Sequence, residues 1–245
     1  MEFLKLLVEK ILPTKYQIGL RYIYLKKTNK LDPEMLYISK LLKNKRRFLD
    51  IGANVGIYAY HFKNTFKNID AFEPLQEITY RLKDFQNEFL KVHNVALSNK
   101  IGELKFYIPH LNGKICTPLA SLEKRDGECE VRTVSVNTVD NYNFDDVDLI
   151  KIDVEGHEQS VIEGALKTIK KTLPIIIIEI EQRHIKQKID KVFQSILNHN
   201  YNGFFLVNGS LTPLKEFSYE LNQKPYLENV MAKGYVNNFI FIPNS

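Results

Sequence analysis

The segment Phe48-Leu49-Asp50-Ile51-Gly52-Ala53-Asn54-Val55-Gly56 decides the fold. Its apolar residues end a predicted strand at 47–51, and apolar residues at helical spacing follow at 57–66. Gly52 and Gly56 permit the sharp turn and the close backbone approach that a ligand-binding loop needs. When such a loop joins a strand to a helix in a parallel sheet, it lies at the carboxyl edge, where cofactors bind.

Two acidic residues indicate which kind of cofactor this loop binds. A dinucleotide site is expected to show G-x-G-x-x-G and a helix N-terminus free to receive pyrophosphate. Here Asp50 stands two residues before Gly52, where a carboxylate repels phosphate. The pattern favours a cofactor with positive groups and no phosphate, such as S-adenosylmethionine. Glu73, 23 residues after Asp50, ends the next strand, where an acid can accept hydrogen bonds from both ribose hydroxyls.

Short apolar strands alternate with helices through the middle of the chain. The expected strands are 47–51, 69–73, 91–95, 149–153 and 175–181, and the expected helices are 57–66, 77–89 and 159–172. This alternation predicts a parallel sheet with helices on both faces. A hairpin around Asn208-Gly209 and a last strand at 235–242 predict an antiparallel C-terminal edge. The expected fold is therefore α/β and Rossmann-like, the mostly parallel twisted sheet of class I methyltransferases.

Residues 1–47 differ from the rest of the chain in charge. They hold 12 Lys and Arg against 4 Asp and Glu, a formal charge of +8, whereas the remainder holds 22 against 25. The sequence predicts a short helix within 1–12 and a second one after Asp32-Pro33, with Asp32 as its cap. We expect a basic helical extension, 1–47, followed by a methyltransferase domain, 48–245. The positive charge of residues 1–47 is interpreted as a solvated helical face; the alternative is a docking surface for an anionic membrane (a peripheral contact), a nucleic acid or an acidic glycan.

The composition argues against several other classes of protein. Charged residues interrupt the apolar residues of 1–12, so no signal peptide is predicted, and no run of about 18 apolar residues occurs. Cys116 and Cys129 match no metal-ligand spacing and are interpreted as free thiols. No motif that interleaves aromatic and basic residues indicates nucleic-acid binding. We therefore expect a cytoplasmic protein without a nucleic-acid partner.

The end of the third predicted strand supplies further candidate cofactor contacts. Asn94 and the residues after Val95, beginning with Ala96, are placed to meet the adenine edge. His93 is interpreted as a structural histidine rather than a catalyst.

A second acidic cluster follows the fourth predicted strand. Lys151, Asp153 and Glu155 share one face of a strand, and the two acids are expected to emerge at the cofactor edge. Glu179 and Glu181 end the adjacent strand. Four carboxylates this close repel one another unless they are protonated, hydrogen-bonded or bridged by a cation. We interpret the cluster as an acceptor site, where a carboxylate or histidine takes a hydroxyl proton as the methyl group moves. Acids that merely cap the following helix are the alternative.

At these motifs the chain resembles the FkbM family of methyltransferases. The resemblance rests on 49–56, 72–74, 94–98 with Gly102, and 149–156, of which the Lys-Ile-Asp-x-Glu-Gly string in 149–156 is the most specific. It implies S-adenosylmethionine binding by the glycine loop and Glu73, catalysis near Asp153 and Glu155, and O-methylation of sugars, glycans or polyketide-type products. The candidate cofactor-binding residues are Asp50, Gly52, Ala53, Asn54, Gly56, Glu73, Asn94 and Ala96, and the candidate catalytic residues are Asp153, Glu155 and His157.

His157 occupies a position that varies in this family. Residues 109–130 and the C-terminal third carry no family motif and are expected to shape the acceptor pocket.

The predicted function is methyl transfer from the sulfonium of S-adenosylmethionine to a hydroxyl of a sugar, glycan or related natural product. One alternative is a metal-assisted O-methyltransferase of a small molecule, in which Asp153, Glu155 and Glu179 hold Mg²⁺; the metal-free mechanism is favoured. The other is a cofactor-binding module that recognises a glycan or membrane partner without turnover.

Overall fold

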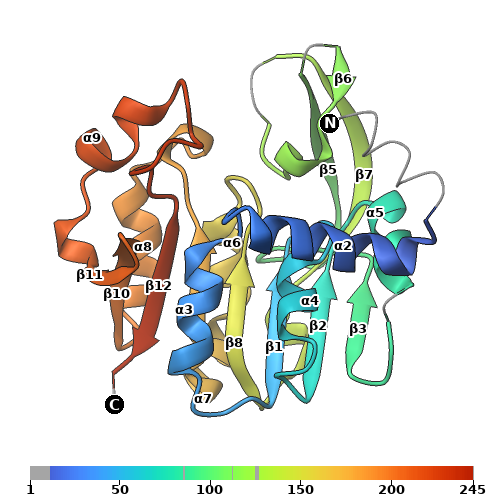
Figure 1. Cartoon of the computed structure of the whole chain (residues 1–245), viewed down its shortest axis with the longest axis horizontal. Coiled ribbons are helices and arrows are strands. Elements are labelled where there is room, and N and C mark those ends of the chain that lie inside the picture. The colour runs from blue at the N-terminus through green and yellow to red at the C-terminus, as the bar shows by residue number, and fades with distance from the viewer. Residues whose placement is uncertain (1–11, 85, 112, 125–126, 245) are drawn as a thin grey trace.

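The main sheet of the protein has eight strands in the order β11-β10-β12-β9-β8-β1-β2-β3, as Figure 1 shows. The computed structural model describes residues 12–84, 86–111, 113–124 and 127–244; the helix predicted within 1–12 falls almost entirely outside them. The strands are β1 (Arg47–Ile51), β2 (Asn68–Phe72), β3 (Leu90–His93), β8 (Val147–Ile152), β9 (Ile175–Glu179), β10 (Tyr201–Val207), β11 (Ser210–Pro213) and β12 (Asn238–Pro243).

The two halves of this sheet differ in strand direction. The five strands β3, β2, β1, β8 and β9 pair in parallel, and β12, β10 and β11 continue the sheet with antiparallel pairs. This arrangement confirms the predicted fold class. β1 has the predicted bounds, and the other four predicted parallel strands are found with ends shifted by one or two residues.

Helices cover both faces of the main sheet (Figure 1). The helices are α2 (Thr14–Lys27), α3 (Pro33–Leu41), α4 (Ile57–Phe62), α5 (Gln76–Lys83), α6 (Glu158–Glu163), α7 (Leu166–Thr172), α8 (Ile189–Leu197) and α9 (Tyr219–Asn222), with single 3₁₀ turns at η1 (Thr117–Leu119), η2 (Val139–Tyr142), η3 (Gln182–His184), η4 (Leu214–Glu216) and η5 (Lys224–Tyr226). The predicted helix 159–172 is thus two helices, separated at Gly164. A Cβ at Gly164 would lie 2.0 Å from the Ser98 carbonyl oxygen, so the backbone at Ser98 lies too close to allow any side chain at position 164.

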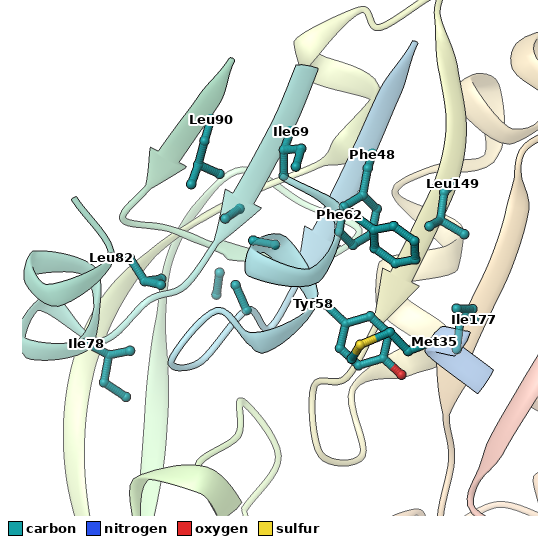
Figure 2. Close-up of a cluster of buried hydrophobic side chains, with 14 of the residues drawn as sticks. Met35, Phe48, Tyr58, Phe62, Ile69, Ile78, Leu82, Leu90, Leu149 and Ile177 are labelled. Atoms are coloured by element: carbon teal, nitrogen blue, oxygen red, sulfur yellow. The ribbon is translucent and has the colours of Figure 1, made fainter. Parts of the chain in front are cut away.

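One face of the sheet carries an aliphatic and aromatic core that extends to the helices before β1. Phe48 and Leu149 point from their strands toward Phe62 of α4 and Met35 of α3 (Figure 2). All four side chains are fully buried. Since α3 shares this core with β1 and β8, it is packed on the sheet rather than held away from it. The opposite face carries a second core with residues of α6, α7 and α8.

A second, smaller sheet was not predicted from the sequence. Its strands, in spatial order, are β4 (Ala96–Leu97), β7 (Cys129–Asn137), β5 (Gly102–Leu111) and β6 (Lys114–Ile115). In Figure 1 the β5–β7 hairpin projects past the carboxyl edge of the main sheet. Phe106 and Val134 anchor it to the core.

The helix α2 was also not predicted. It runs across the carboxyl ends of β1 and β2 in Figure 1 and contacts α4. Tyr22 Oη lies 2.7 Å from His61 Nδ1, and a Cβ at Gly19 would lie 2.9 Å from Tyr60 Oη. These contacts fix α2 against α4. Among the described residues, no helix has both the length and the apolar character needed to cross a membrane.

Candidate active site

Two cavities meet at the carboxyl edge of the main sheet, on either side of the glycine loop. The first, of about 560 Å³, is called the Glu73 cavity, and the second, of about 660 Å³, is called the Lys151 cavity. Gly52, Asn54 and Asp153 line both.

The glycine loop has the tight geometry that the sequence predicted. Gly52 adopts φ +76°, and a Cβ there would lie 1.7 Å from the Asp153 carbonyl oxygen. Any side chain at position 52 would therefore push the β1 and β8 loops apart. Gly56 adopts φ +80°, and its missing Cβ leaves room for Leu82 rather than for a ligand. Ala53 lines the Lys151 cavity, whereas Gly56 lines neither cavity and acts through the turn.

Glu73 is the one buried acid in the Glu73 cavity. Its Oε2 accepts a hydrogen bond from the Asn54 amide at 3.0 Å, and its Oε1 accepts one from the Leu75 amide at 2.9 Å. Burial raises the pKa of Glu73 to about 7, although these two hydrogen bonds act in the opposite direction. Each oxygen keeps a further lone pair for a ligand hydroxyl.

Apolar residues form most of the remaining wall of the Glu73 cavity. They include Phe72, Val95, Ala96, Leu97, Phe106, Pro118, Ala120 and Leu122. Ala96 is thus in the predicted place. Thr117, Pro118, Ala120 and Leu122 of the 109–130 segment, which is expected to shape the acceptor pocket, line this cavity. Among the described residues, none of the C-terminal third lines either cavity.

Asn94 has a different role from the predicted contact with adenine. It does not line the Glu73 cavity. Its Nδ2 donates hydrogen bonds to the Pro74 carbonyl at 2.8 Å and to Thr79 Oγ1 at 3.0 Å. The amide therefore fastens the turn that carries Glu73. His93 lies 2.7 Å from Asp70 Oδ1 and stacks on Phe72, as a structural histidine does.

A buried lysine occupies the centre of the acidic cluster. Lys151 is 2% exposed, and its Nζ lies 3.9 Å from Asp153 Oδ2 and 3.9 Å from Glu179 Oε2. Burial lowers the pKa of Lys151, but Asp153, Glu179, Asp32 and Asp50 outweigh it, so the net shift is upward. The cation that keeps these carboxylates together is therefore a residue of the chain itself.

Asp50 is the register partner of Lys151 on the neighbouring strand. Its Oδ2 accepts a hydrogen bond from the Ala59 amide at 3.0 Å. Burial raises the pKa of Asp50 to about 7, and the positive charge of Lys151 opposes this shift. Asp50 thus ties the start of α4 to the charged centre and lines the Lys151 cavity.

Asp153 and Glu155 follow β8 at the cofactor edge, as predicted, but they differ in surroundings. The Asp153 side chain is 36% exposed at the junction of the two cavities. Burial raises the pKa of Asp153 to about 6, with Lys151 opposing the shift. Glu155 lines only the Glu73 cavity, adopts φ +55°, and its Oε2 lies 2.8 Å from His184 Nδ1.

His157 does not fit the predicted role of general base. Its Nδ1 lies 2.7 Å from Glu123 Oε1 and its Nε2 lies 2.9 Å from Ser98 Oγ. Both ring nitrogens are engaged, so neither is left to take a proton from an acceptor. The hydrogen bond to His157 lowers the pKa of Glu123. The pair Glu123–His157 holds the segment after η1 against the body of the domain.

Glu179 and Glu181 separate into two environments. Glu179 accepts a hydrogen bond from Asn237 Nδ2 at 2.7 Å and faces Lys151. Glu181 Oε2 accepts a hydrogen bond from Arg183 Nε at 2.5 Å and another from the Tyr235 hydroxyl. Across the described ranges, no group of three or more His, Cys, Asp or Glu side chains is arranged to hold a metal ion. In the alternative Mg²⁺ set of Asp153, Glu155 and Glu179, Lys151 Nζ lies 3.9 Å from both Asp153 and Glu179.

Two residues of the Lys151 cavity were missed or misassigned. Asp32, predicted to cap α3, makes no side-chain cap hydrogen bond and lines the cavity instead. Tyr58 of α4 is 8% exposed and lines the same cavity. Burial and then the charge of Asp32 raise the pKa of Tyr58. In a sequence, an Asp-Pro pair at the start of a helix predicts that the Asp caps that helix. That Asp32 faces a cavity follows only from the packing of α3 on the sheet.

These residues suit S-adenosylmethionine by the chemistry of their donor and acceptor groups. The Glu73 cavity offers apolar walls to a purine and a buried carboxylate to ribose hydroxyls. The Lys151 cavity offers Asp50 and Asp153 to positive groups, and Lys151 to a carboxylate. Neither cavity presents the free helix N-terminus of a pyrophosphate site, because Asp50 lies beneath the start of α4. The fold and the site together define a class I S-adenosylmethionine-dependent methyltransferase.

Comparison with known proteins gives the family. Residues 50–202 match the methyltransferase FkbM domain. Because the match spans more than half of the chain, this protein belongs to the FkbM family of S-adenosylmethionine-dependent methyltransferases. A search of curated protein sequences gave no match.

Two solved structures are similar in fold. One is a methyltransferase FkbM from Methylobacillus flagellatus KT, with 16% identity and a TM-score of 0.54 over 93% of this chain. The match covers 54% of that protein, so this chain spans about half its length. The other is a TehB-like S-adenosylmethionine-dependent methyltransferase from Corynebacterium glutamicum ATCC 13032, with 13% identity and a TM-score of 0.50 over 94% of this chain and 98% of that one.

Proposed function

We propose that the protein transfers a methyl group from S-adenosylmethionine to a hydroxyl oxygen of a sugar, a glycan or a related natural product. One observation carries this proposal: the Asp153 carboxylate lies where the two cavities join and is partly exposed there. A hydroxyl must lose its proton when it is methylated, and a carboxylate at that junction can take it.

The residues around Asp153 support this role. Burial brings the pKa of Asp153 to about 6, close to neutral pH, where a general base works best. Lys151 keeps the carboxylate charged and in place from the buried side. When bound, the cofactor supplies an electrophilic methyl group. Glu73 and Asp50 hold positions from which they orient its two ends, which removes much of the entropic barrier.

We assign the methionine end of the cofactor to the side of the Lys151 cavity formed by Asp50 and Asp153, and the rest of this cavity favours a polyhydroxylated acceptor. That remaining wall combines the Tyr58 hydroxyl with charged groups, among them Asp32 and Lys30. Such groups donate and accept hydrogen bonds in alternation, as a sugar ring requires, whereas an apolar acceptor would leave them unpaired.

The test is mass spectrometry of surface glycans from the host with and without this gene. We expect deletion to remove about 14 daltons, one CH₂, from a glycan species, and the wild-type gene to restore it. Complementation with Asp153→Asn should fail although the variant folds. A protein that binds S-adenosylmethionine but methylates nothing in a panel of glycans would contradict catalysis and favour a recognition module.

A further inference from the structure

The helix α2 has a second apolar face that points away from the protein. Leu20, Ile23 and Tyr24 are 47%, 47% and 45% exposed. With about 100° between successive residues, they lie on the side of the helix opposite Ile18 and Leu25. Ile18 is buried, and Leu25 packs against the core of the domain. The helix α2 therefore has two apolar faces: one packs against the domain at α4, and the other is exposed.

Basic residues border this outer face. Lys26 lies on one flank and Lys27 at its C-terminal end, and the 14 residues of α2 include no Asp or Glu. Among the described residues, neither of these two lysine side chains forms an ion pair. Their positive charge is thus available to a partner.

We propose that the outer face of α2 docks on an anionic lipid membrane. An apolar strip bordered by lysines on a surface helix suits the boundary between headgroups and acyl chains. The basic stems can extend to the phosphates while Leu20 and Ile23 enter the apolar layer. A nucleic acid would attract the same charges, but its phosphate backbone offers no apolar layer for Leu20 and Ile23.

Docking by this face would place the active site near the lipid headgroups. The same helix lines the Lys151 cavity with Arg21 and Leu25. The contacts of Gly19 and Tyr22 with α4 keep α2 in a fixed position relative to that cavity. The membrane would therefore orient the whole domain.

The test is co-sedimentation of the full chain with vesicles of phosphatidylcholine and phosphatidylglycerol in equal parts, and with pure phosphatidylcholine. We expect binding to the anionic vesicles only, weakening as salt rises. Lys26→Gln/Lys27→Gln should lower the affinity about 30-fold, since each basic residue contributes about 1 kcal/mol at an anionic surface. Leu20→Ser/Ile23→Ser should lower it by roughly tenfold or more.

Matched variants elsewhere on the surface serve as controls. Lys170→Gln/Lys171→Gln removes a pair of lysines from the last turn of α7. Ile101→Ser/Leu221→Ser removes two apolar side chains that are 63% and 70% exposed. Both should sediment like the wild type, and all variants should bind S-adenosylhomocysteine equally.

Three results would overturn the proposal. One is folded wild-type protein that stays in solution with anionic vesicles at low salt. Another is an equal loss in the α2 variants and in their controls. The third is duplex DNA binding that exceeds vesicle binding and depends on Lys26 and Lys27 but not on Leu20 and Ile23, which would assign the face to a nucleic acid.

Discussion

The Glu73 cavity and the Lys151 cavity share three residues but are built on opposite principles. In the first, a single buried acid held by two backbone amides faces apolar walls. In the second, a buried lysine lies among carboxylates, and charge balance rather than shape determines the arrangement. The first kind of site selects a ligand by fit and a few hydrogen bonds. The second keeps charges in fixed positions, as the proposed proton transfer to Asp153 requires.

The largest effect is expected from Asp153→Asn. Loss of a positioned base typically lowers turnover by about 10²–10⁴-fold, while the amide preserves shape and folding. Wild-type turnover should fall as pH drops through about 6, because Asp153 must be ionised to accept a proton. Transfer of labelled methyl from S-adenosylmethionine measures both.

Glu155→Gln is the matched control for this prediction, because Glu155 lines only the Glu73 cavity. It should reduce turnover less than Asp153→Asn. Equal losses would remove the distinction between the cavities, and near wild-type turnover of Asp153→Asn would show that Asp153 is not the general base.

A second large effect is expected from Lys151→Met. Removal of one partner from a buried ionic cluster typically costs about 3–5 kcal/mol, because Asp50, Asp153 and Glu179 would face one another without a cation. Urea denaturation at pH 8 measures it. The loss should shrink toward pH 5, where the carboxylates are protonated. A loss that does not vary with pH would mean that Lys151 acts only by packing.

A smaller effect is expected from Glu73→Ala. Hydrogen bonds to a charged group contribute roughly 1.5–3 kcal/mol, which corresponds to a rise of about 10- to 150-fold in the dissociation constant of the cofactor. Titration calorimetry with S-adenosylmethionine checks it, with circular dichroism as the control for folding. Unchanged affinity in a folded variant would place the ribose elsewhere.

The smallest effect concerns Glu158, a carboxyl outside both cavities. Its Oε2 is buried without a partner, and burial raises the pKa of Glu158 to about 8. A folded-state pKa above the unfolded value favours folding at low pH, and this contribution is lost as pH rises toward 8. Glu158→Gln should therefore lose roughly 2 kcal/mol less stability than the wild type between pH 6 and pH 8. Identical pH profiles of the melting temperature would show that this residue does not titrate there.

The predicted and unpredicted parts of the fold differ in how their residues are buried. The central strands were predicted because they are apolar on both faces, as at 175–178. In β5 and β7 only alternate residues such as Phe106 and Val134 are buried, and the other side chains are polar or exposed. The helix α2 has apolar residues on two opposite faces, which weakens the single-face period that identifies a helix.

In the site, the sequence identified the residues that belong to motifs, but not the residues that tertiary packing brings next to them. Asp50, Glu73 and Asp153 were predicted because a strand end fixes each of them at the carboxyl edge. The places of Asp32 and Tyr58 depend on α3 and α4 folding over that edge, which no local spacing encodes. The engaged nitrogens of His157 likewise depend on partners at positions 98 and 123, far away in sequence.

With the acceptor in the Lys151 cavity, as proposed, the Asn54 backbone would link its binding thermodynamically to that of the cofactor. Its amide donates to Glu73, and the residue forms part of both cavities. A cofactor that fixes Glu73 therefore also fixes the wall that the acceptor meets. Each ligand should then raise the affinity for the other by the same factor, since such coupling is reciprocal. Because both ligands would contact the same backbone turn at Asn54, we expect an ordered kinetic mechanism in which the cofactor binds first.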